Sequence, residues 1–323
     1  MISVIVITYN SGWDELEKTI LSILRQKDVA FEILVADDGS QIKWNDRIRE
    51  LMEHAGFGKY RFADSTVNEG TVKNVYKALQ MAEGDYVKVI APGDLLYNEN
   101  TLRQWYAFAC EQKADICFGD AVYYRCSQGT VQQIQTRKAP VNAWLYDGQQ
   151  SRRKVFVNYL LANDFILGAA LLADRQILLE YISQMVDKVK YAEDYALRLM
   201  VFDGRSIIHF PQKVLWYEYG TGMSTSKNET WKKRLLSDFD QTNEIILSRE
   251  HGSDRIVEKY QRFLRRSKHS ALIIRIPLLK KVLKCISFPD MIWFRRRFSR
   301  TDALTSVGQD QTFIDQIFGS QEV

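Results

Sequence analysis

The chain opens with Ile2-Ser3-Val4-Ile5-Val6-Ile7-Thr8-Tyr9-Asn10, a nearly continuous apolar run that ends in hydrogen-bonding residues. Such a run is typical of a buried strand in a parallel sheet. Three more signals follow within the first hundred residues, each after a predicted strand: Asp37-Asp38-Gly39-Ser40, Asn68-Glu69-Gly70 and Pro92-Gly93-Asp94. Open α/β sheets bind ligands at the carboxyl ends of their strands. The four signals together therefore predict one nucleotide-type site.

Strands and helices alternate through the first half of the chain, with short connections. This alternation predicts an α/β fold with a Rossmann-like, mostly parallel sheet flanked by helices. The predicted strands are 2–7, 31–36, 59–63, 86–91 and 114–119, and the predicted helices between them are 16–24, 44–55, 72–82 and 101–112. Farther on we expect an edge hairpin over 121–134, helices at 156–163, 174–185, 192–202, 231–249 and 253–268, and strands at 207–210 and 214–217.

The adjacent carboxylates of Asp37 and Asp38 end a predicted buried strand. Carboxylates there suit hydrogen bonds to a base N–H or to ribose hydroxyls, but Asp, Gly and Ser also favour ordinary turn and cap chemistry. Tyr9 has the same two interpretations, because its ring could lie flat against a nucleobase or simply pack.

Asn68 and Gly70 precede a predicted helix, and Lys73 lies one turn inside it. Helix N-terminal N–H groups bind phosphates, and a lysine nearby would add a cation. The alternative is an ordinary helix start with a surface lysine.

In this order the residues resemble family 2 of the glycosyltransferases. The resemblance covers about residues 1–225, and it is carried by Val4–Asn10, Ile33–Ser40, Asn68-Glu69-Gly70, Gly84-Asp85-Tyr86-Val87 and Glu193-Asp194-Tyr195. It implies the GT-A fold and transfer of a sugar from a nucleotide-sugar donor with inversion. It also implies a non-processive enzyme, since no Gln-x-x-Arg-Trp motif is present.

The resemblance also assigns roles to residues. Thr8, Tyr9, Asp37 and Asp38 would line the nucleoside pocket beside Asn10, and Asp94 would lie near the diphosphate. Asp194 would be the catalytic base, with Glu193 as an acceptor contact or an orienting residue. The alternative for two acids at a helix start is complementarity to the helix dipole.

The metal motif of the family is incomplete in this chain. Members commonly carry Asp-x-Asp after the fourth strand, and here Ala91 and Gly93 stand where acids are usual, leaving Asp94. Mg²⁺ can be held by one or two carboxylates with substrate phosphates and water, so we expect a divalent cofactor, Mg²⁺ or Mn²⁺, on Asp94. The alternative is that Asp94 contacts sugar or ribose and no metal takes part.

The charge of the chain is uneven. Residues 262–300 carry 12 Lys and Arg against Asp290, so the net charge of +4 leaves −7 elsewhere. Cations mixed with aliphatic residues suit an anionic membrane surface. Nucleic-acid binding and plain helix packing are the alternatives, and we expect no nucleic acid. The predicted domains are a catalytic GT-A domain over 1–225 and a helical, basic C-terminal extension over 226–323.

The function expected from the resemblance is transfer of one sugar, from a UDP-sugar, to a glycan or polyprenyl-linked acceptor in surface polysaccharide synthesis. The protein would be cytoplasmic and peripheral at the inner face of the cell membrane. Residues 165–170 resemble an acceptor-side loop, and residues 219–225 resemble a loop that closes over the donor. The alternative function is a catalytically silent relative that binds nucleotide sugar or serves as a scaffold.

Overall fold

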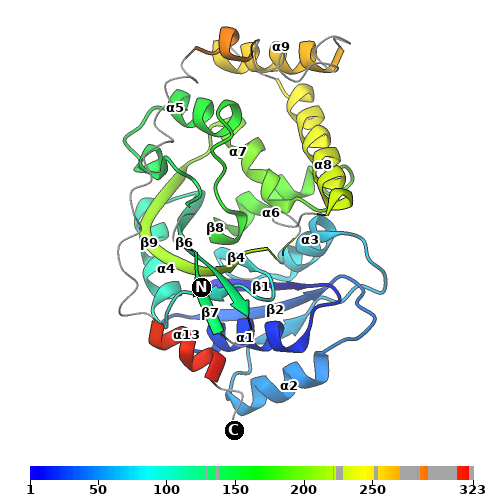
Figure 1. Ribbon diagram of the computed structural model, residues 1–323, viewed down its shortest axis with the longest axis vertical. Helices are drawn as coiled ribbons and strands as arrows, with labels where there is room; N and C mark the ends of the chain where they lie inside the picture. Colours follow the sequence, from blue (N-terminus) through cyan, green and yellow to red (C-terminus); the bar gives the residue numbers. More distant parts are fainter. Residues whose placement is uncertain are drawn as a thin grey trace.

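The computed structural model describes residues 1–127, 130–134, 138–220, 222, 228–250, 254–269, 282, 284–289 and 311–319. Within these residues a single nine-stranded sheet, in the order β3-β2-β1-β4-β8-β6-β9-β5 with β7 added to β6, runs through the molecule (Figure 1). The strands are β1 (Ile2–Thr8), β2 (Phe31–Asp37), β3 (Tyr60–Phe62), β4 (Tyr86–Ile90), β5 (Leu95–Leu96), β6 (Ile116–Ser127), β7 (Thr130–Gln133), β8 (Leu171–Asp174) and β9 (Ile207–Glu218).

The sheet is mostly parallel, as predicted. Strands β1, β2, β3, β4, β6 and β9 run in one direction, whereas β5, β7 and β8 run opposite to them. The parallel register pairs Thr8 with Asp37, so the polar ends of β1 and β2 meet at one edge. Two of the sequence signals for a nucleotide-type site, at Thr8–Asn10 and Asp37–Ser40, therefore lie at this edge.

Apolar residues alternate between the two faces of the central strands, as the period of a strand requires. Val4 and Val6 of β1 join the cluster under α1, α2 and α4, whereas Ile5 joins the cluster under α3, α6 and α7. The helices are α1 (Trp13–Leu24), α2 (Asn45–His54), α3 (Thr71–Met81), α4 (Thr101–Gln112), α5 (Arg152–Phe156), α6 (Arg175–Ser183), α7 (Ala196–Asp203), α8 (Glu229–Ser248), α9 (Arg255–His269) and α13 (Gln311–Phe318).

The second half of the sheet departs from the predicted elements. The strands predicted at 114–119 and 121–125 form one strand, β6, whose register shifts around Asp120; the pair at 207–210 and 214–217 likewise forms β9. Strands β5 and β8 were not predicted. They contain two and four residues, and runs this short carry too little periodicity to be distinguished from loops.

The predicted helix at 192–202 begins as a tighter turn. Residues Glu193–Tyr195 form the 3₁₀ turn η4, and α7 follows directly from Ala196. The predicted helix at 156–163 is a π-helical turn over Val157–Leu161 that continues α5. The predicted N-cap of α6 is confirmed, because Asp174 accepts a hydrogen bond from the Ile177 N–H at 3.0 Å.

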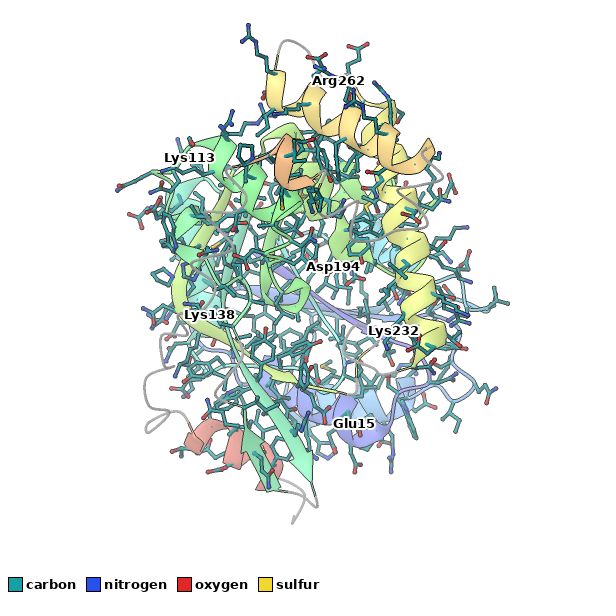
Figure 2. The ribbon with its side chains drawn as sticks, turned by 45° about the horizontal axis from the view of Figure 1, so that its top comes forward. Glu15, Lys113, Lys138, Asp194, Lys232 and Arg262 are labelled. Carbon is teal, nitrogen blue, oxygen red and sulfur yellow. The ribbon has the colours of Figure 1, made fainter. Side chains whose placement is uncertain are left out.

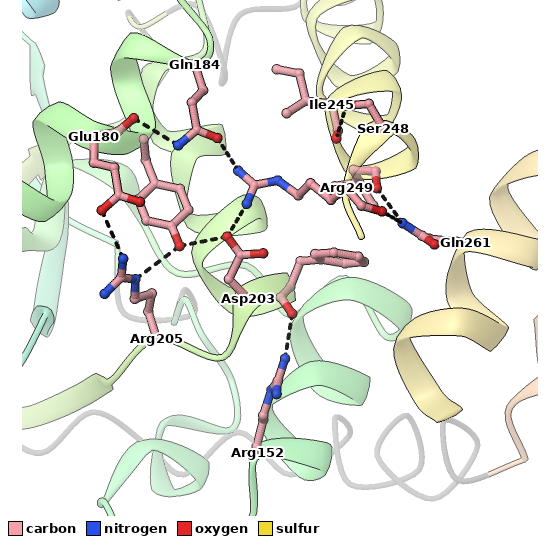
Figure 3. A network of polar contacts seen from close by, with 12 residues as sticks. Arg152, Glu180, Gln184, Asp203, Arg205, Ile245, Ser248, Arg249 and Gln261 are labelled. Atoms are coloured by element: carbon pink, nitrogen blue, oxygen red, sulfur yellow. Dashed lines mark hydrogen bonds and ion pairs between the residues drawn. The ribbon is translucent and has the colours of Figure 1, made fainter. Parts of the chain in front are cut away.

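A polar network links α8 and α9 to α6 and α7 (Figure 3). The Arg249 guanidinium donates to Gln184 at 2.6 Å and pairs with Asp203, which also accepts from Tyr181. Gln261 of α9 donates to the Arg249 carbonyl at 2.8 Å. Both helices also contribute to the apolar cluster under α7. The boundary proposed at 225 stays a prediction.

The predicted membrane segment, 262–300, is described only in part. Phe263 and Leu264 of α9 are buried in the protein, while Arg262, Arg265 and Arg266 are exposed. The described part of α9 therefore turns its apolar side to the core and its cations to solvent. Residues 270–281 and 290–300, which hold most of the predicted aliphatic residues, lie outside the described residues. No helix among the described residues is long and apolar enough to cross a membrane.

Helix α13 packs beneath the loop that carries Asp94. Ile314 and Ile317 are fully buried in a cluster with Leu95 of β5 and Trp216 of β9. Figure 1 shows α13 beside α1, at the side of the sheet away from α9.

Candidate active site

Asp37 and Asp38, the two acids predicted to bind the nucleoside, have different surroundings. Asp37 accepts a hydrogen bond from the Ser40 N–H at 2.8 Å and shapes the turn after β2. Asp38 accepts from the N–H groups of Glu69 and Gly70 at 2.8 and 2.9 Å, so both of its oxygens hold the loop before α3. Burial raises the pKa of Asp38, and these two hydrogen bonds oppose that rise. The cap interpretation therefore describes the contacts of Asp38, and a role in nucleoside binding stays a prediction.

Thr8, Tyr9 and Asn10 lie at the same edge of the sheet. The Thr8 hydroxyl donates to Ser11 at 2.9 Å, and the Asn10 N–H donates to the Ser40 hydroxyl at 2.7 Å. Tyr9 is 49% exposed, so its ring does not belong to the core. Of the two interpretations of Tyr9, the exposed ring favours a surface that could lie against a base.

Backbone N–H groups at the start of α3 already form hydrogen bonds within the protein. Gly70 has a φ of +99°, and the Val72 N–H donates to the Lys190 carbonyl at 3.1 Å. A Cβ on Gly70 would lie 2.5 Å from that carbonyl oxygen. Asn68 and Lys73 are half-buried beside this contact. The expected phosphate site at this helix therefore shares its N–H groups with Asp38 and Lys190, and it stays a prediction.

Asp94 is buried in the turn between β4 and β5, and Glu218 of β9 lies against it. The Glu218 N–H donates to Asp94 at 3.3 Å. A Cβ on Gly93, where φ is +94°, would lie 2.5 Å from a Glu218 carboxylate oxygen. The Glu218 carboxylate thus occupies the space that a side chain at position 93 would need.

Lys88 is a fully buried cation beneath this pair. Its ammonium donates to the Val89 carbonyl at 2.7 Å and to the Ala169 carbonyl. Burial lowers the pKa of Lys88, and the charges of Asp94 and Glu193 oppose that change. Burial raises the pKa of Asp94, and Lys88 opposes it in turn. Each charge therefore reduces the cost of burying the other.

Glu193 and Asp194 lie on the turn η4, where both are half-buried and line a cavity; Figure 2 labels Asp194. Burial raises the pKa of Asp194 to about 6. Burial and the neighbouring Asp194 raise the pKa of Glu193 to about 8. A Cβ on Gly168 would lie 2.6 Å from the Asp194 Cβ, so the predicted acceptor-side loop approaches Asp194 because residue 168 has no side chain.

Asp238 of α8 holds the segment that leads to η4. Its carboxylate accepts hydrogen bonds from three consecutive backbone N–H groups: Lys190 at 3.1 Å, Tyr191 at 2.7 Å and Ala192 at 3.0 Å. Asp238 is 4% exposed. It is therefore a positioning residue for the two acids that follow.

One cavity of about 200 Å³ joins these groups. Its lining includes Asp94 and Glu218 from the sheet, Glu193 and Asp194 from η4, and Gly168 between them. The cavity brings together the predicted metal ligand and the predicted base. Within the described residues, Tyr9, Asp37 and Asp38 do not line this cavity, and their role in binding a nucleoside stays a prediction. Gly222 also lines the cavity, but most of the predicted closing loop lies outside the described residues.

The carboxylates present fit a divalent ion, although the described residues contain no group of three or more His, Cys, Asp or Glu side chains that could hold one. Asp94 and Glu218 offer two oxygen donors on one cavity, and Mg²⁺ sites often use one or two carboxylates with substrate phosphates. The sequence interpretation missed Glu218, Lys88 and Asp238. Only Lys88 had a signal, since a lysine inside an apolar strand requires a buried partner.

Comparisons with known proteins identify the family of the chain. Residues 3–172 match the model of the family described as Glycosyl transferase family 2. An uncharacterized glycosyltransferase of Mycoplasma genitalium is 30% identical over 138 residues, which are 42% of this chain and 45% of that protein. A homolog from Mycoplasma pneumoniae is 33% identical over 105 residues, covering 32% of this chain and 34% of that protein. The chain thus spans less than half the length of these curated relatives.

Solved structures share the fold. S. aureus TarS 1-349 in complex with UDP-GlcNAc has a TM-score of 0.54 at 18% identity, covering 90% of this chain and 80% of that chain. The mannosyltransferase PcManGT from Pyrobaculum calidifontis, in complex with GDP-Man and Mn²⁺, has a TM-score of 0.53 at 14% identity, covering 93% and 76%. The predicted GT-A fold is confirmed.

Proposed function

The chain belongs to glycosyl transferase family 2, and from this premise we propose that it moves one sugar from a nucleotide-sugar donor to a hydroxyl of a glycan acceptor, with inversion. The observation that carries the proposal is the shared cavity: Asp94 and Glu218 line one part of it, and Glu193 and Asp194 line another. Inverting transfer requires a base within hydrogen-bond reach of the acceptor hydroxyl, on the side of the sugar opposite the leaving diphosphate.

Asp194 is the proposed base. Its raised pKa, about 6, leaves it mostly ionised near neutral pH and still basic enough to accept a proton. Glu193, with its pKa raised to about 8, is mostly protonated there and can donate a hydrogen bond. The two neighbouring acids thus suit different roles, with Glu193 orienting the acceptor or the base.

The proposed donor is a UDP-sugar, and the proposed cofactor is Mg²⁺ or Mn²⁺. TarS binds UDP-GlcNAc and PcManGT binds GDP-Man with Mn²⁺, which supports a nucleotide-sugar donor and the use of a metal. Asp94 and Glu218 would hold the ion, which would neutralise charge on the diphosphate. Tyr9, Asp37 and Asp38 would take the nucleoside, with Thr8, Asn10, Asn68, Gly70 and Lys73 around it.

The proposed acceptor is a lipid-linked glycan of surface polysaccharide synthesis, met at the inner face of the cell membrane. The exposed arginines of α9 support attraction to an anionic membrane surface. Sedimentation with anionic liposomes tests this part: substituting Arg262, Arg265 and Arg266 with Gln should reduce binding, and unchanged binding would contradict it.

Asp194→Asn tests the chemistry. In a screen of UDP-, GDP- and dTDP-sugars with and without Mn²⁺, we expect the wild-type protein to release nucleoside diphosphate from a UDP-sugar. Asp194→Asn should lower kcat by about 100-fold or more, as loss of a general base does. The exposed Asp187→Asn is the control and should match wild type. A screen without turnover, or an active Asp194→Asn, would contradict the proposal.

A further inference from the structure

Arg234 lies in an unusual setting beside the cavity. Its guanidinium carbon is 4.7 Å from the ring centroid of Trp231 and 5.3 Å from that of Tyr191. The two rings meet edge to face with centroids 5.2 Å apart. A guanidinium held against aromatic faces keeps its in-plane N–H groups free to bind an anion and loses little freedom in doing so.

The stacked arginine adjoins the site. Tyr191 and Leu235, the residue after Arg234, both line the cavity that contains Asp194. Arg234 itself is exposed, so it lies at the rim on the α8 side. Figure 2 labels Lys232, which marks the start of the same helix.

Arg234 has no counter-ion within the part of the chain that the structure describes. Lys232, two residues earlier, pairs with Glu229 at 2.6 Å. The carboxylate of Asp238 accepts hydrogen bonds from backbone N–H groups. Among the described residues, the contacts of Arg234 are with the rings of Tyr191 and Trp231. A bidentate donor in this state suits a phosphate or a carboxylate.

The position of Arg234 indicates which of the two substrates, sugar donor or acceptor, would carry an anion bound there. The proposed site of the donor diphosphate is at Asp94, in the turn before β5, and Glu218, at the end of β9, whereas Arg234 lies on α8. Tyr191 comes three residues before Asp194, and the base must face the acceptor hydroxyl. An anion on Arg234 would therefore be part of the acceptor.

We propose that Arg234, stacked on Tyr191 and Trp231, binds an anionic group of the acceptor, a phosphate or a carboxylate near the hydroxyl that receives the sugar. This inference rests on the proposed function and names the acceptor class for the same site.

Calorimetric titration with inorganic phosphate tests the site without turnover. The full chain should bind phosphate about tenfold more tightly than Arg234→Gln, since a hydrogen-bonded ion pair is lost. Lys233→Gln, which removes a neighbouring exposed charge, is the matched control and should bind as wild type. Equal affinity of wild type and Arg234→Gln would overturn the proposal.

Matched acceptors identify the source of the anion. Octyl glucoside is neutral, octyl glucuronide carries a carboxylate, and glucose linked to farnesyl diphosphate carries phosphates. One anionic acceptor should have a KM about tenfold below that of the neutral one, and Arg234→Gln should remove this advantage without changing the donor KM. A neutral acceptor used equally well, or an effect on the donor KM, would overturn the proposal. If no sugar is transferred at all, the proposed function fails, while the phosphate titration still decides on Arg234.

Discussion

The carboxylate of Asp238 accepts a hydrogen bond of 2.7 Å from the backbone N–H of Tyr191. With its bonds to Lys190 and Ala192, this contact connects α8 to the segment that ends at Glu193 and Asp194. A helix beyond the predicted domain boundary thus sets the position of the proposed base. Substituting Asp238 should therefore affect catalysis although its carboxylate bonds to backbone N–H groups and not to substrate.

Asp238→Asn should keep the fold and lose activity. An amide offers one acceptor oxygen where the carboxylate offers two, so at least one N–H group becomes unpaired, which costs about 1–3 kcal/mol. We expect kcat to fall about tenfold, because small displacements of a base are costly, with donor affinity unchanged. Steady-state kinetics and nucleotide titration measure both. Asp240→Asn, exposed on the same helix, is the control, and a kcat equal to that control would show that Asp238 does not position the site.

Activity should depend on pH through Asp194. Because a base acts when deprotonated, kcat/KM should fall about tenfold per pH unit below the pKa of about 6. Glu193→Gln should retain activity near pH 7, since Gln imitates a protonated Glu with a pKa of about 8. Initial rates over the pH range measure this. A flat profile, or an inactive Glu193→Gln, would assign the roles differently.

Asp194 should also make the stability of the folded protein depend on pH. The folded-state pKa of Asp194 lies above its usual value, so the folded protein binds more protons between about pH 4 and 6, and stability falls as pH rises through that window. Asp194→Asn removes a desolvated charge and should therefore raise Tm at about pH 8, with little change near pH 4. Thermal unfolding at both pH values gives the answer; a lower Tm at pH 8 would mean that the carboxylate is stabilised by its surroundings.

Glu218 should contribute to metal affinity. If its carboxylate replaces the acid missing at position 93, Glu218→Gln and Asp94→Asn should each weaken Mn²⁺ binding in the presence of UDP by about tenfold or more. Electron paramagnetic resonance of free Mn²⁺ measures this independently of turnover. Glu53→Gln, an exposed acid on α2, serves as the control. Unchanged affinity in Glu218→Gln would leave Asp94 as the single carboxylate.

Gly70→Ala should disturb the contact between α3 and the segment at 190. The new Cβ would meet the Lys190 carbonyl at 2.5 Å in a backbone of positive φ, and we expect a loss of about 1–3 kcal/mol in the free energy of unfolding. Gly56→Ala is the matched control, because Gly56 also has a positive φ but open space around it. Chemical denaturation measures the difference, and equal losses would show that the contact with Lys190 contributes nothing.

The parallel half of the fold could be predicted from the sequence, whereas the roles assigned to the site residues stay predictions. Apolar runs and helical spacing are local properties, so β1, β2, β4 and the helices between them were recognisable. The polar ends of β1 and β2 meet at one edge of the sheet, as expected. The resemblance added Asp194 and Asp94, which the structure places on one cavity.

Tertiary structure alone decided the partners of these residues. Glu218 meets Asp94 across 124 positions of sequence because β9 returns beside β6 and reaches β5, an order that no local pattern encodes. Asp238 and Arg234 contact the segment at 190–192 because α8 packs against α7 after the last strand. Local physics gives each segment its shape and its reactive groups, whereas the charges that tune those groups depend on which distant segments the packing of the core brings together.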